Sequence, residues 1–218
     1  NRARELVRQI MTFSRRSEQN IRLTQVQEIV EEALKLLRSS LPSTIEIESD
    51  VDPSCEKILA DPTQLHQIVM NLCTNSFHAM QGEGGVLRIS LHPAILSGDA
   101  VSGNPHLRPG SYVRLRVSDS GVGMPLEVST KIFEPYFTTK TKGEGTGLGL
   151  AVVHGIVSGL GGDITVQSEP GVGTTFTIYL PAAVTAEAPP RESTPAPLPT
   201  GDEHVLVVGN QSRHVQGV

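Results

Sequence analysis

A stripe of amide and imidazole side chains follows one face of a helix predicted over residues 61–80. It consists of Gln67, Asn71, Asn75 and His78, which at about 100° per residue fall on the same side of the helix. An exposed stripe would favour charged residues, because Asn is a poor helix former, yet this one contains no Lys or Glu. The amides either satisfy backbone groups nearby or form an Asn-x-x-x-Asn pair that holds Mg²⁺ against a triphosphate, since Mg²⁺ takes few protein ligands. The pattern alone supports both interpretations equally.

The segment DSGVG (119–123) follows directly on a predicted strand. A carboxylate at a strand end, here Asp119, can accept a hydrogen bond from an exocyclic amine, and glycines beside it let a ligand approach the backbone. Taken as an isolated D-x-G-x-G pattern, the segment is explained more simply by a turn that the aspartate caps.

A second segment, GEGTGLG (143–149), has glycine at every other position and leads into an apolar helix predicted over 147–159. Lys140 and Lys142 lie just before it. Free N–H groups and the positive dipole end of a helix N-terminus suit phosphates, which favours phosphate binding over a plain flexible loop. The segment is not a Walker loop, because no glycine directly precedes a Lys-Ser/Thr pair, and Leu150 breaks the G-x-G-x-x-G pattern.

An aromatic segment, IFEPYFTTK (132–140), separates the two glycine-rich segments. It contains three of the chain's eight Phe and Tyr residues. These rings either form a small satellite core under a loop or anchor a mobile lid from which Lys140 and Lys142 reach toward a ligand.

Short β-type runs alternate with helical patterns and define the fold class. Strands are predicted at 44–51, 86–92, 111–118, 163–168 and 173–180. A further helix is predicted at 24–38, with Pro42 as its stop. Gly-rich turns near the last three strands indicate antiparallel pairs in a mixed sheet. We therefore expect an α/β two-layer sandwich, in which helices cover one face of a mixed β-sheet, rather than a doubly wound sheet.

Composition and charge narrow the class of protein. The 218 residues carry a formal net charge of −5, which supplies no basic field, so no nucleic-acid partner is expected. Two cysteines without metal-type spacing, Cys55 and Cys73, indicate reduced structural thiols. The chain contains no run of 18 apolar residues of the kind that could span a membrane. We expect a cytoplasmic location, which leaves room for a membrane-anchored parent protein.

The chain divides into four segments. Residues 1–19 have the pattern of the end of an amphipathic helix. Residues 20–181 are the expected globular domain, and residues 182–203 form a Pro- and Ala-rich linker that cannot bury a core. Residues 204–218 begin with HVLVV, a pattern typical of the first strand of another domain. Because the chain starts at Asn1 rather than Met, we expect a fragment of a larger protein.

Together and in this order, the segments resemble the histidine-kinase branch of the ATPase superfamily that also contains gyrase-type topoisomerases and mismatch-repair ATPases. NLCTNSFHAM resembles the family's asparagine box, DSGVGM its first glycine box and IFEPYFTTK its phenylalanine box. GEGTGLGLAVVHGIV resembles the second glycine box, and GVGTTFTIYLP the closing strand. The match covers about residues 24–181, and its motifs agree in order and spacing. The resemblance implies the ATP-binding catalytic domain of a two-component sensor histidine kinase.

The resemblance also implies roles for single residues. Asp119 would bind the adenine amino group, Asn75 would coordinate Mg²⁺ and Asn71 would support the metal or the phosphates. His78 would approach a phosphate, and Lys140 would complete a catalytic set with Asn71, Asn75 and His78.

The remaining ATP contacts would come from a lid over about residues 125–146 and from the two glycine-rich segments. The phosphate end of the pocket would include Lys142, Gly145, Thr146, Gly147, Leu148 and Gly149. The base end would include Gly121, Gly123, Thr174 and Thr175.

One position separates a kinase from a hydrolase in this resemblance. Gyrase-type relatives carry a glutamate at the place of Asn71, where it activates the attacking water, and an amide cannot act as a general base. The site is therefore expected to hold ATP without rapid hydrolysis and to transfer its γ-phosphoryl group to a histidine. Two alternatives stay open, a non-catalytic nucleotide-dependent docking module and a gyrase-like ATPase.

Residues 1–19 resemble the second helix of the family's dimerisation hairpin. The phosphoacceptor histidine belongs on the first helix, which this chain lacks, so the chain alone is predicted not to autophosphorylate. The implied partners are that hairpin and a response regulator receiver domain, and the full-length protein is expected to be a homodimer. EHVLVVGNQ resembles the opening strand of a receiver domain, although Gly209, Asn210 and Gln211 stand where receivers place acidic Mg²⁺ ligands. Residues 204–218 are thus either a degenerate receiver or an unrelated tail.

Overall fold

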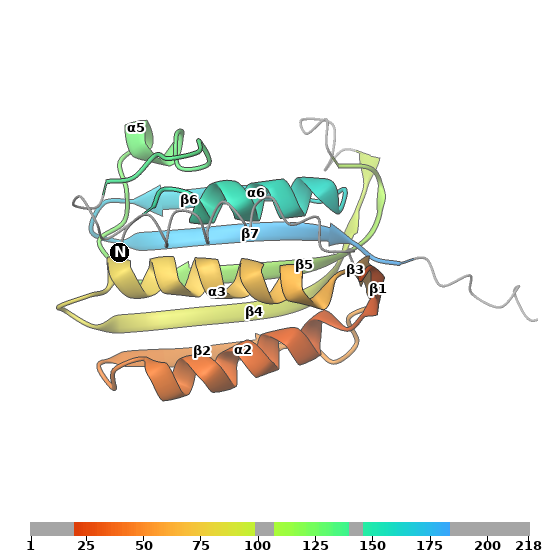
Figure 1. The fold of residues 1–218 in the computed structure, drawn as a ribbon, viewed down its shortest axis with the longest axis horizontal. Coiled ribbons are helices and arrows are strands. Elements are labelled where there is room, and N and C mark those ends of the chain that lie inside the picture. The colour runs from red at the N-terminus through yellow and green to blue at the C-terminus, as the bar shows by residue number, and fades with distance from the viewer. Residues whose placement is uncertain (1–19, 99–106, 140–145, 184–218) are drawn as a thin grey trace, which may run out of the picture. The chain divides into compact units, whose positions relative to one another are not determined.

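The computed structural model describes residues 20–98, 107–139 and 146–183, which build a five-stranded mixed sheet (Figure 1). The strand order is β2-β4-β5-β7-β6. β2 pairs with β4 in parallel, whereas the other neighbours are antiparallel. The strand bounds are β2 (Ile45–Val51), β4 (Gly85–Leu96), β5 (Gly110–Asp119), β6 (Asp163–Glu169) and β7 (Gly173–Pro181). The mixed sheet with antiparallel pairs predicted from the sequence is confirmed.

Three helices, α2 (Val26–Ser40), α3 (Pro62–Ala79) and α6 (Gly149–Gly159), cover one face of this sheet (Figure 1). α3 lies in the middle and packs against both α2 and α6. This arrangement confirms the predicted α/β two-layer sandwich. Each helix overlaps a helical pattern in the sequence, and the bounds differ by a few residues, as expected for helix ends that fray.

Side-chain alternation along the strands explains why only one face carries helices. In β5, Val113, Leu115 and Val117 are buried under the helices. The intervening Arg114 and Arg116 point the other way, because successive side chains of a strand lie on opposite faces. The sheet therefore has an apolar inner face and a polar outer face.

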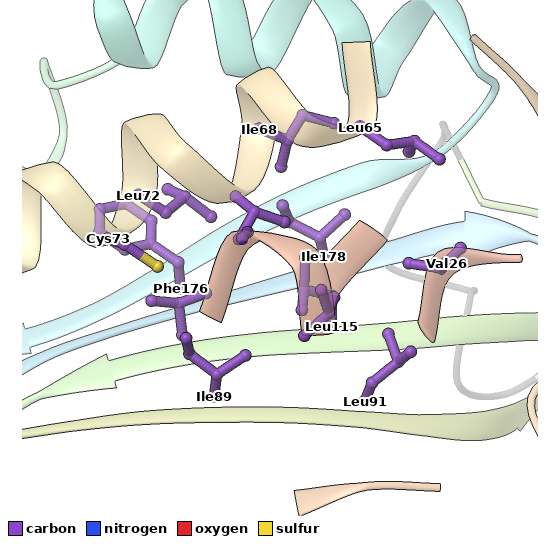
Figure 2. Packing of buried hydrophobic residues seen from close by; sticks show 14 of the residues in the cluster. Val26, Leu65, Ile68, Leu72, Cys73, Ile89, Leu91, Leu115, Phe176 and Ile178 are labelled. Atoms are coloured by element: carbon purple, nitrogen blue, oxygen red, sulfur yellow. The ribbon is translucent and has the colours of Figure 1, made fainter. Parts of the chain in front are cut away.

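The core lies between the inner face of the sheet and the helices (Figure 2). Leu65, Ile68 and Leu72 of α3 are at most 2% exposed. They lie over sheet residues such as Leu115 and Ile178, which are equally buried (Figure 2). Truncating one of these side chains to Ala would leave a cavity, at a cost of about 2–5 kcal/mol of stability.

Three short elements were not predicted from the sequence. β1 (Arg22–Thr24) and β3 (Ile58–Ala60) form a separate two-stranded antiparallel sheet, and α5 (Leu126–Ser129) is a single helical turn. Elements of three or four residues are too short to show a hydrophobic period of two or of 3.6. Only tertiary pairing reveals them.

The ends of the two longest helices are set by local chemistry. α3 begins after Asp61, whose carboxylate accepts a hydrogen bond from the Thr63 N–H at 2.8 Å, and Pro62 occupies its first turn. α2 ends at Ser40, and its C-cap residue Leu41 has an extended backbone directly before Pro42, the predicted stop. The start of α3 fixes the direction in which its polar stripe points.

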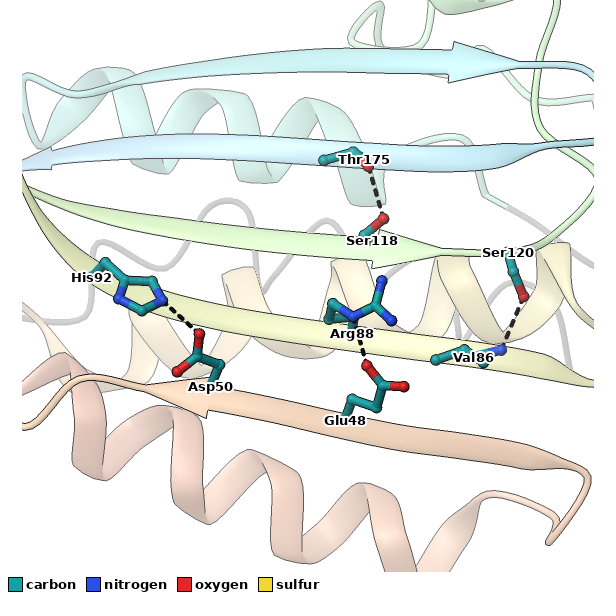
Figure 3. A network of polar contacts seen from close by, with 8 residues as sticks. All are labelled: Glu48, Asp50, Val86, Arg88, His92, Ser118, Ser120 and Thr175. Carbon is teal, nitrogen blue, oxygen red and sulfur yellow. Dashed lines mark hydrogen bonds and ion pairs between the residues drawn. The ribbon is translucent and has the colours of Figure 1, made fainter.

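The outer face of the sheet carries exposed polar contacts (Figure 3). Arg88 of β4 pairs with Glu48 of β2 at 2.6 Å, and the His92 ring lies 3.0 Å from the Asp50 carboxylate. Exposed ion pairs of this kind contribute little to stability, because water and salt screen them. The fold is therefore held mainly by the inner, apolar face.

Both cysteines are free and buried, in agreement with the expected structural role. Burial raises the pKa of the Cys73 thiol to about 12 and that of Cys55 to about 11, so both stay protonated at neutral pH. Within the described residues, no helix combines the length and apolar character needed to cross a membrane.

The turn after β5 presses against the C-terminal end of α3. The Val122 N–H donates a hydrogen bond to the Ala79 carbonyl at 3.0 Å. A Cβ atom added to Gly121 would lie only 2.6 Å from the same carbonyl oxygen. Gly121 is therefore required for the close approach that brings the end of β5 to α3.

We expect Gly121→Ala to destabilise the domain by about 1–3 kcal/mol, because the added methyl overpacks rigid backbone. Urea unfolding followed by circular dichroism would measure this change. Gly155→Ala is the matched control, since Gly155 is exposed within α6 and nothing lies within 4 Å of its added Cβ. That substitution should stabilise the domain by about 0.5–1 kcal/mol, because Ala is the better helix former. Equal effects of the two substitutions would contradict the predicted close approach.

Candidate functional site

A pocket of about 650 Å³ opens between the second half of α3, the turn after β5, the segment 124–139, the start of α6 and the start of β7. Its volume lies within the range of small-molecule sites. It is lined by Met70, Asn71, Thr74, Asn75, Ser76, His78, Ala79, Asp119, Val122, Gly123, Met124, Val128, Ile132, Phe137, Thr138, Thr139, Thr146, Gly147, Gly149, Leu150, Thr174 and Phe176.

Asp119 supplies a buried carboxylate to this pocket. The residue is 7% exposed and ends β5. Its Oδ2 accepts a hydrogen bond from the Ser76 hydroxyl at 2.8 Å, and its Oδ1 accepts one from the Gly121 N–H at 3.0 Å. Burial raises the pKa of this carboxyl above its ordinary value, and the hydrogen bonds from Ser76 and the backbone only partly oppose that rise. The sequence-based alternative of a capped turn is also realised, since Asp119 does bond to Gly121.

The predicted polar stripe of α3 is only partly in the pocket. Asn71, Asn75 and His78 line it, whereas Gln67 does not. The Asn71 amide nitrogen donates to the Gly149 carbonyl at 3.3 Å, which joins α3 to the first residue of α6. The His78 ring lies 5.4 Å, centroid to centroid, from that of Phe77. Asn71 therefore satisfies a nearby backbone group, as one of the two interpretations held. This bond involves the amide nitrogen and not the amide oxygen.

The helix N-terminus predicted after the second glycine-rich segment borders the same pocket. α6 begins at Gly149, and its N-cap residue Leu148 makes no side-chain cap. The first N–H groups of α6 therefore lack an acceptor from the N-cap side chain, and together with the helix dipole they favour an anion there. Thr146, Gly147 and Gly149 line this end of the pocket. Lys140, Lys142 and Gly145 lie outside the described residues.

The aromatic segment contacts the glycine-rich segment that precedes α6. Ile132 is 4% exposed, and Phe133 and Phe137 pack against the core. The Tyr136 N–H donates to the Gly147 carbonyl at 2.9 Å, and Gly147 has a φ of 67°. Any Cβ at position 147 would clash with the Tyr136 backbone. The segment therefore packs on the main core instead of forming a separate satellite core, and the lid interpretation depends also on residues 140–145, outside the described residues.

The two threonines predicted at the base end lie on opposite faces of β7. Thr174 is 5% exposed and lines the pocket. Thr175 faces the outer side, where its hydroxyl lies 2.7 Å from that of Ser118 (Figure 3). The expected place of Thr175 in the pocket is therefore wrong, because neighbouring strand residues cannot share a face.

The glycines of the first glycine-rich segment act through the backbone. Gly123 lines the pocket at a φ of 64°, and its absent Cβ leaves room for the Glu169 carbonyl. Gly121 contributes the N–H that Asp119 accepts. Gly123 therefore borders the pocket through a close backbone contact, whereas Gly121 does not line it, and the nucleotide contacts expected of both stay a prediction.

Ser76 is one of the pocket residues that sequence reasoning missed, and it is the one bonded to Asp119. It follows Asn75 by one position and falls on the apolar side of α3, four residues after Leu72. It is nevertheless 1% exposed and bonded to Asp119. A small hydroxyl on an otherwise apolar helix face was the signal that could have revealed it.

The pocket is thus lined both by a buried carboxylate and by the N-terminus of a helix. The carboxylate can accept a hydrogen bond from an amine, and the helix N-terminus can hold an anion. A nucleotide can carry both an amine, on its base, and an anion, on its phosphates, at opposite ends of one molecule. The fold and the site therefore define a nucleotide-binding α/β domain.

Comparisons with known proteins identify the family. Residues 60–184 match the family model described as histidine kinase-, DNA gyrase B-, and HSP90-like ATPase. The sensor kinase CckA of Brucella abortus is 38% identical over 84% of this chain and 19% of its own length. The sensor histidine kinase ZraS of Escherichia coli is 36% identical over 74% of this chain and 31% of its own. The chain therefore spans less than a third of these curated relatives.

A solved structure with a similar fold is the catalytic domain of the histidine kinase ThkA. It is 28% identical, with a TM-score of 0.60 over 74% of this chain and 95% of that one. The chain belongs to the family of histidine kinase-, DNA gyrase B- and HSP90-like ATPases, and the relatives named above are sensor kinases.

The raised pKa of Asp119 predicts how stability depends on pH. The folded state holds this proton more tightly than the unfolded chain, whose carboxyl has the ordinary pKa of 3.8. The carboxyl therefore favours folding fully below pH 3.8, and this contribution is lost as pH rises through the folded pKa. Asn does not titrate, so the free energy of unfolding of the wild type minus that of Asp119→Asn should fall over this interval.

Urea unfolding of both proteins at a series of pH values would measure this difference. Altered hydrogen bonding in the variant adds an offset, so the slope with pH is the diagnostic quantity. Because other titrating groups are common to both proteins, their contributions cancel. A difference that stays constant or rises with pH would show that Asp119 does not have a raised pKa.

Proposed function

We propose that this domain binds Mg-ATP in the pocket and presents the γ-phosphoryl group to a histidine on a dimerisation hairpin. The observation that supports this proposal is that Asp119 and the first residue of α6, Gly149, line the same pocket. The adenine amino group would donate to the Asp119 carboxylate, and the phosphates would accept from the first N–H groups of α6. Phosphoryl transfer would then depend on positioning and charge neutralisation.

The residues of α3 would serve the phosphate end. Asn75 fits a Mg²⁺ ligand, because Mg²⁺ prefers oxygen and pairs few protein ligands with substrate phosphates. Asn71 would support the metal or the phosphates through its amide oxygen, which its bond to Gly149 does not use. His78 would approach a phosphate. Lys140 and Lys142 would neutralise phosphate charge from a lid over about residues 125–146.

The residue type at position 71 favours a kinase over a hydrolase. An amide has no basic lone pair with which to take a proton from water, so Asn71 cannot activate a water molecule. ATP would therefore persist in the site until another nucleophile arrives. A gyrase-like ATPase is disfavoured on this ground, and a non-catalytic docking module remains the second candidate.

The partners follow from the family resemblance. The hairpin with the phosphoacceptor histidine would dock on the domain, with residues 1–19 as the remnant of its second helix, and the phosphoryl group would pass to a response regulator receiver domain. The full-length protein would be a homodimer in the cytoplasm. The free, buried thiols support that location. Backbone hydrogen bonds continue through Ala182 and Ala183, two residues beyond the expected domain end at 181, and the proposed linker and receiver-like segment follow.

Titration calorimetry with ADP and ATP in the presence of Mg²⁺ tests the nucleotide pocket. We expect Asp119→Asn to weaken binding about ten- to a hundredfold, because a hydrogen bond to a charged group contributes about 1.5–3 kcal/mol. Asp163→Asn is a matched control, since Asp163 begins β6 and does not line the pocket. The affinity of Asp163→Asn for ADP and ATP should equal that of the wild type. Absence of nucleotide binding by the wild-type chain would refute the pocket assignment.

Phosphotransfer is tested by supplying the missing hairpin as a separate polypeptide. With labelled ATP, the chain alone should yield no acid-labile phosphate, because it lacks the acceptor helix. Adding the hairpin should produce phosphohistidine on the hairpin. Labelling of the chain alone would refute the predicted need for the hairpin. ATP binding without transfer to the added hairpin would instead favour the docking module.

A further inference from the structure

Ser76 places a hydroxyl in the wall of the pocket, directly behind the Asp119 carboxylate. Its side chain lines the pocket, and the residue is 1% exposed. The Ser76 Oγ lies 2.8 Å from Asp119 Oδ2, and the two residues are 43 positions apart in the sequence. Because a carboxylate cannot donate, the hydroxyl must be the donor whenever Asp119 is ionised. This bond joins two rigid elements, α3 and β5.

The carboxylate of Asp119 has few acceptor positions left for a ligand. A carboxylate offers about four lone-pair positions. Ser76 occupies one on Oδ2, and the Gly121 N–H occupies one on Oδ1 at 3.0 Å. A backbone hydrogen bond from Thr174 also acts on the group. Each oxygen is thus held from the protein side, which leaves the outward positions for a donor in the pocket.

Two bonds on different oxygens also fix the rotation of the carboxylate. With Gly121 alone, the group could turn about its last side-chain bond, a torsion with broad preferences. Ser76 removes this freedom before any ligand arrives. Charge-assisted bonds of this type are short and strong, so the orientation is held firmly.

We propose that Ser76 is a positioning residue that sets the base specificity of the pocket by holding the Asp119 carboxylate as an acceptor. This inference rests on the proposed binding of the nucleotide base at Asp119. A base with an exocyclic amine meets an acceptor that is already oriented toward it. A base with a keto oxygen at the same place brings two acceptors together, which costs affinity.

Removing the hydroxyl should therefore change specificity as well as affinity. The Ser76 hydrogen bond lowers the pKa of Asp119, so its loss would favour the protonated carboxyl. A protonated carboxyl can donate to a keto oxygen. The variant should lose affinity for an amine-bearing base and tolerate a keto-bearing base better.

The test compares the binding of ADP and inosine diphosphate to the wild type and Ser76→Ala by calorimetry. We expect ADP to bind Ser76→Ala up to about tenfold more weakly, because binding must then immobilise a carboxylate that Ser76 no longer holds. The affinity for inosine diphosphate should fall less or should rise. The dissociation constant of inosine diphosphate divided by that of ADP should therefore be smaller in the variant than in the wild type. Ser76→Cys retains a weak donor and should give an intermediate ratio.

Ser118→Ala is the matched control. Ser118 adjoins Asp119 but faces the outer side of the sheet, where it contacts Thr175 (Figure 3). This substitution removes a hydroxyl next to Asp119 in the sequence, at a residue that does not line the pocket. The ratio for Ser118→Ala should equal that of the wild type.

The outcomes separate this proposal from the proposed function. If the wild type binds ADP but Ser76→Ala weakens both nucleotides equally, or neither, Ser76 has no role in specificity and the inference is overturned. If the wild type binds neither nucleotide, the function proposed for the pocket fails first. The side-chain carboxyl ¹³C resonance of Asp119 in nucleotide-free protein gives an independent check, because it should shift in Ser76→Ala and stay in Ser118→Ala. A resonance that does not respond to Ser76→Ala would also overturn the inference.

Discussion

The contact between the C-terminal half of α3 and the end of β5 is the constraint on which the pocket depends. There, burial works against the charged form of Asp119, while donors from Ser76 and Gly121 work for it. These donors reach the carboxylate only because the turn after β5 approaches the helix to backbone contact, with the Val122 N–H bonded to Ala79. A single buried acid therefore requires a helix, a strand and a glycine turn to lie in direct contact.

The pocket also requires that the N-terminus of α6 be held in a fixed position relative to Asp119. α6 is an apolar helix whose Val153 and Val157 are fully buried, so the core fixes its position. Its N-terminus is in turn tied to α3 by the bond from Asn71 to Gly149 and joined to the aromatic segment through Gly147 and Tyr136. The site is thus assembled from elements that the apolar core already places, and the polar groups complete it.

The amides of α3 show how one side chain can serve both the fold and a ligand. An amide has a donor end and an acceptor end, so Asn71 can donate to Gly149 and still offer an oxygen. A glutamate at this position would have no donor for that carbonyl. The amide at position 71 therefore has a structural consequence in addition to the absence of a general base.

The sequence by itself determined the fold class, the main helices and strands, and part of the pocket lining. Hydrophobic periodicity is local, so it predicted α3 and β5, whereas the family resemblance implied the nucleotide-site positions of Asp119, Asn75 and Gly147, which line the pocket. Tertiary structure alone decided the pairing of β1 with β3, the outward direction of Thr175 and the role of Ser76. Each of these features depends on a contact with a segment distant in the sequence. Such a contact pairs a three-residue strand, decides which face of a strand is buried and gives a buried hydroxyl its hydrogen-bond partner.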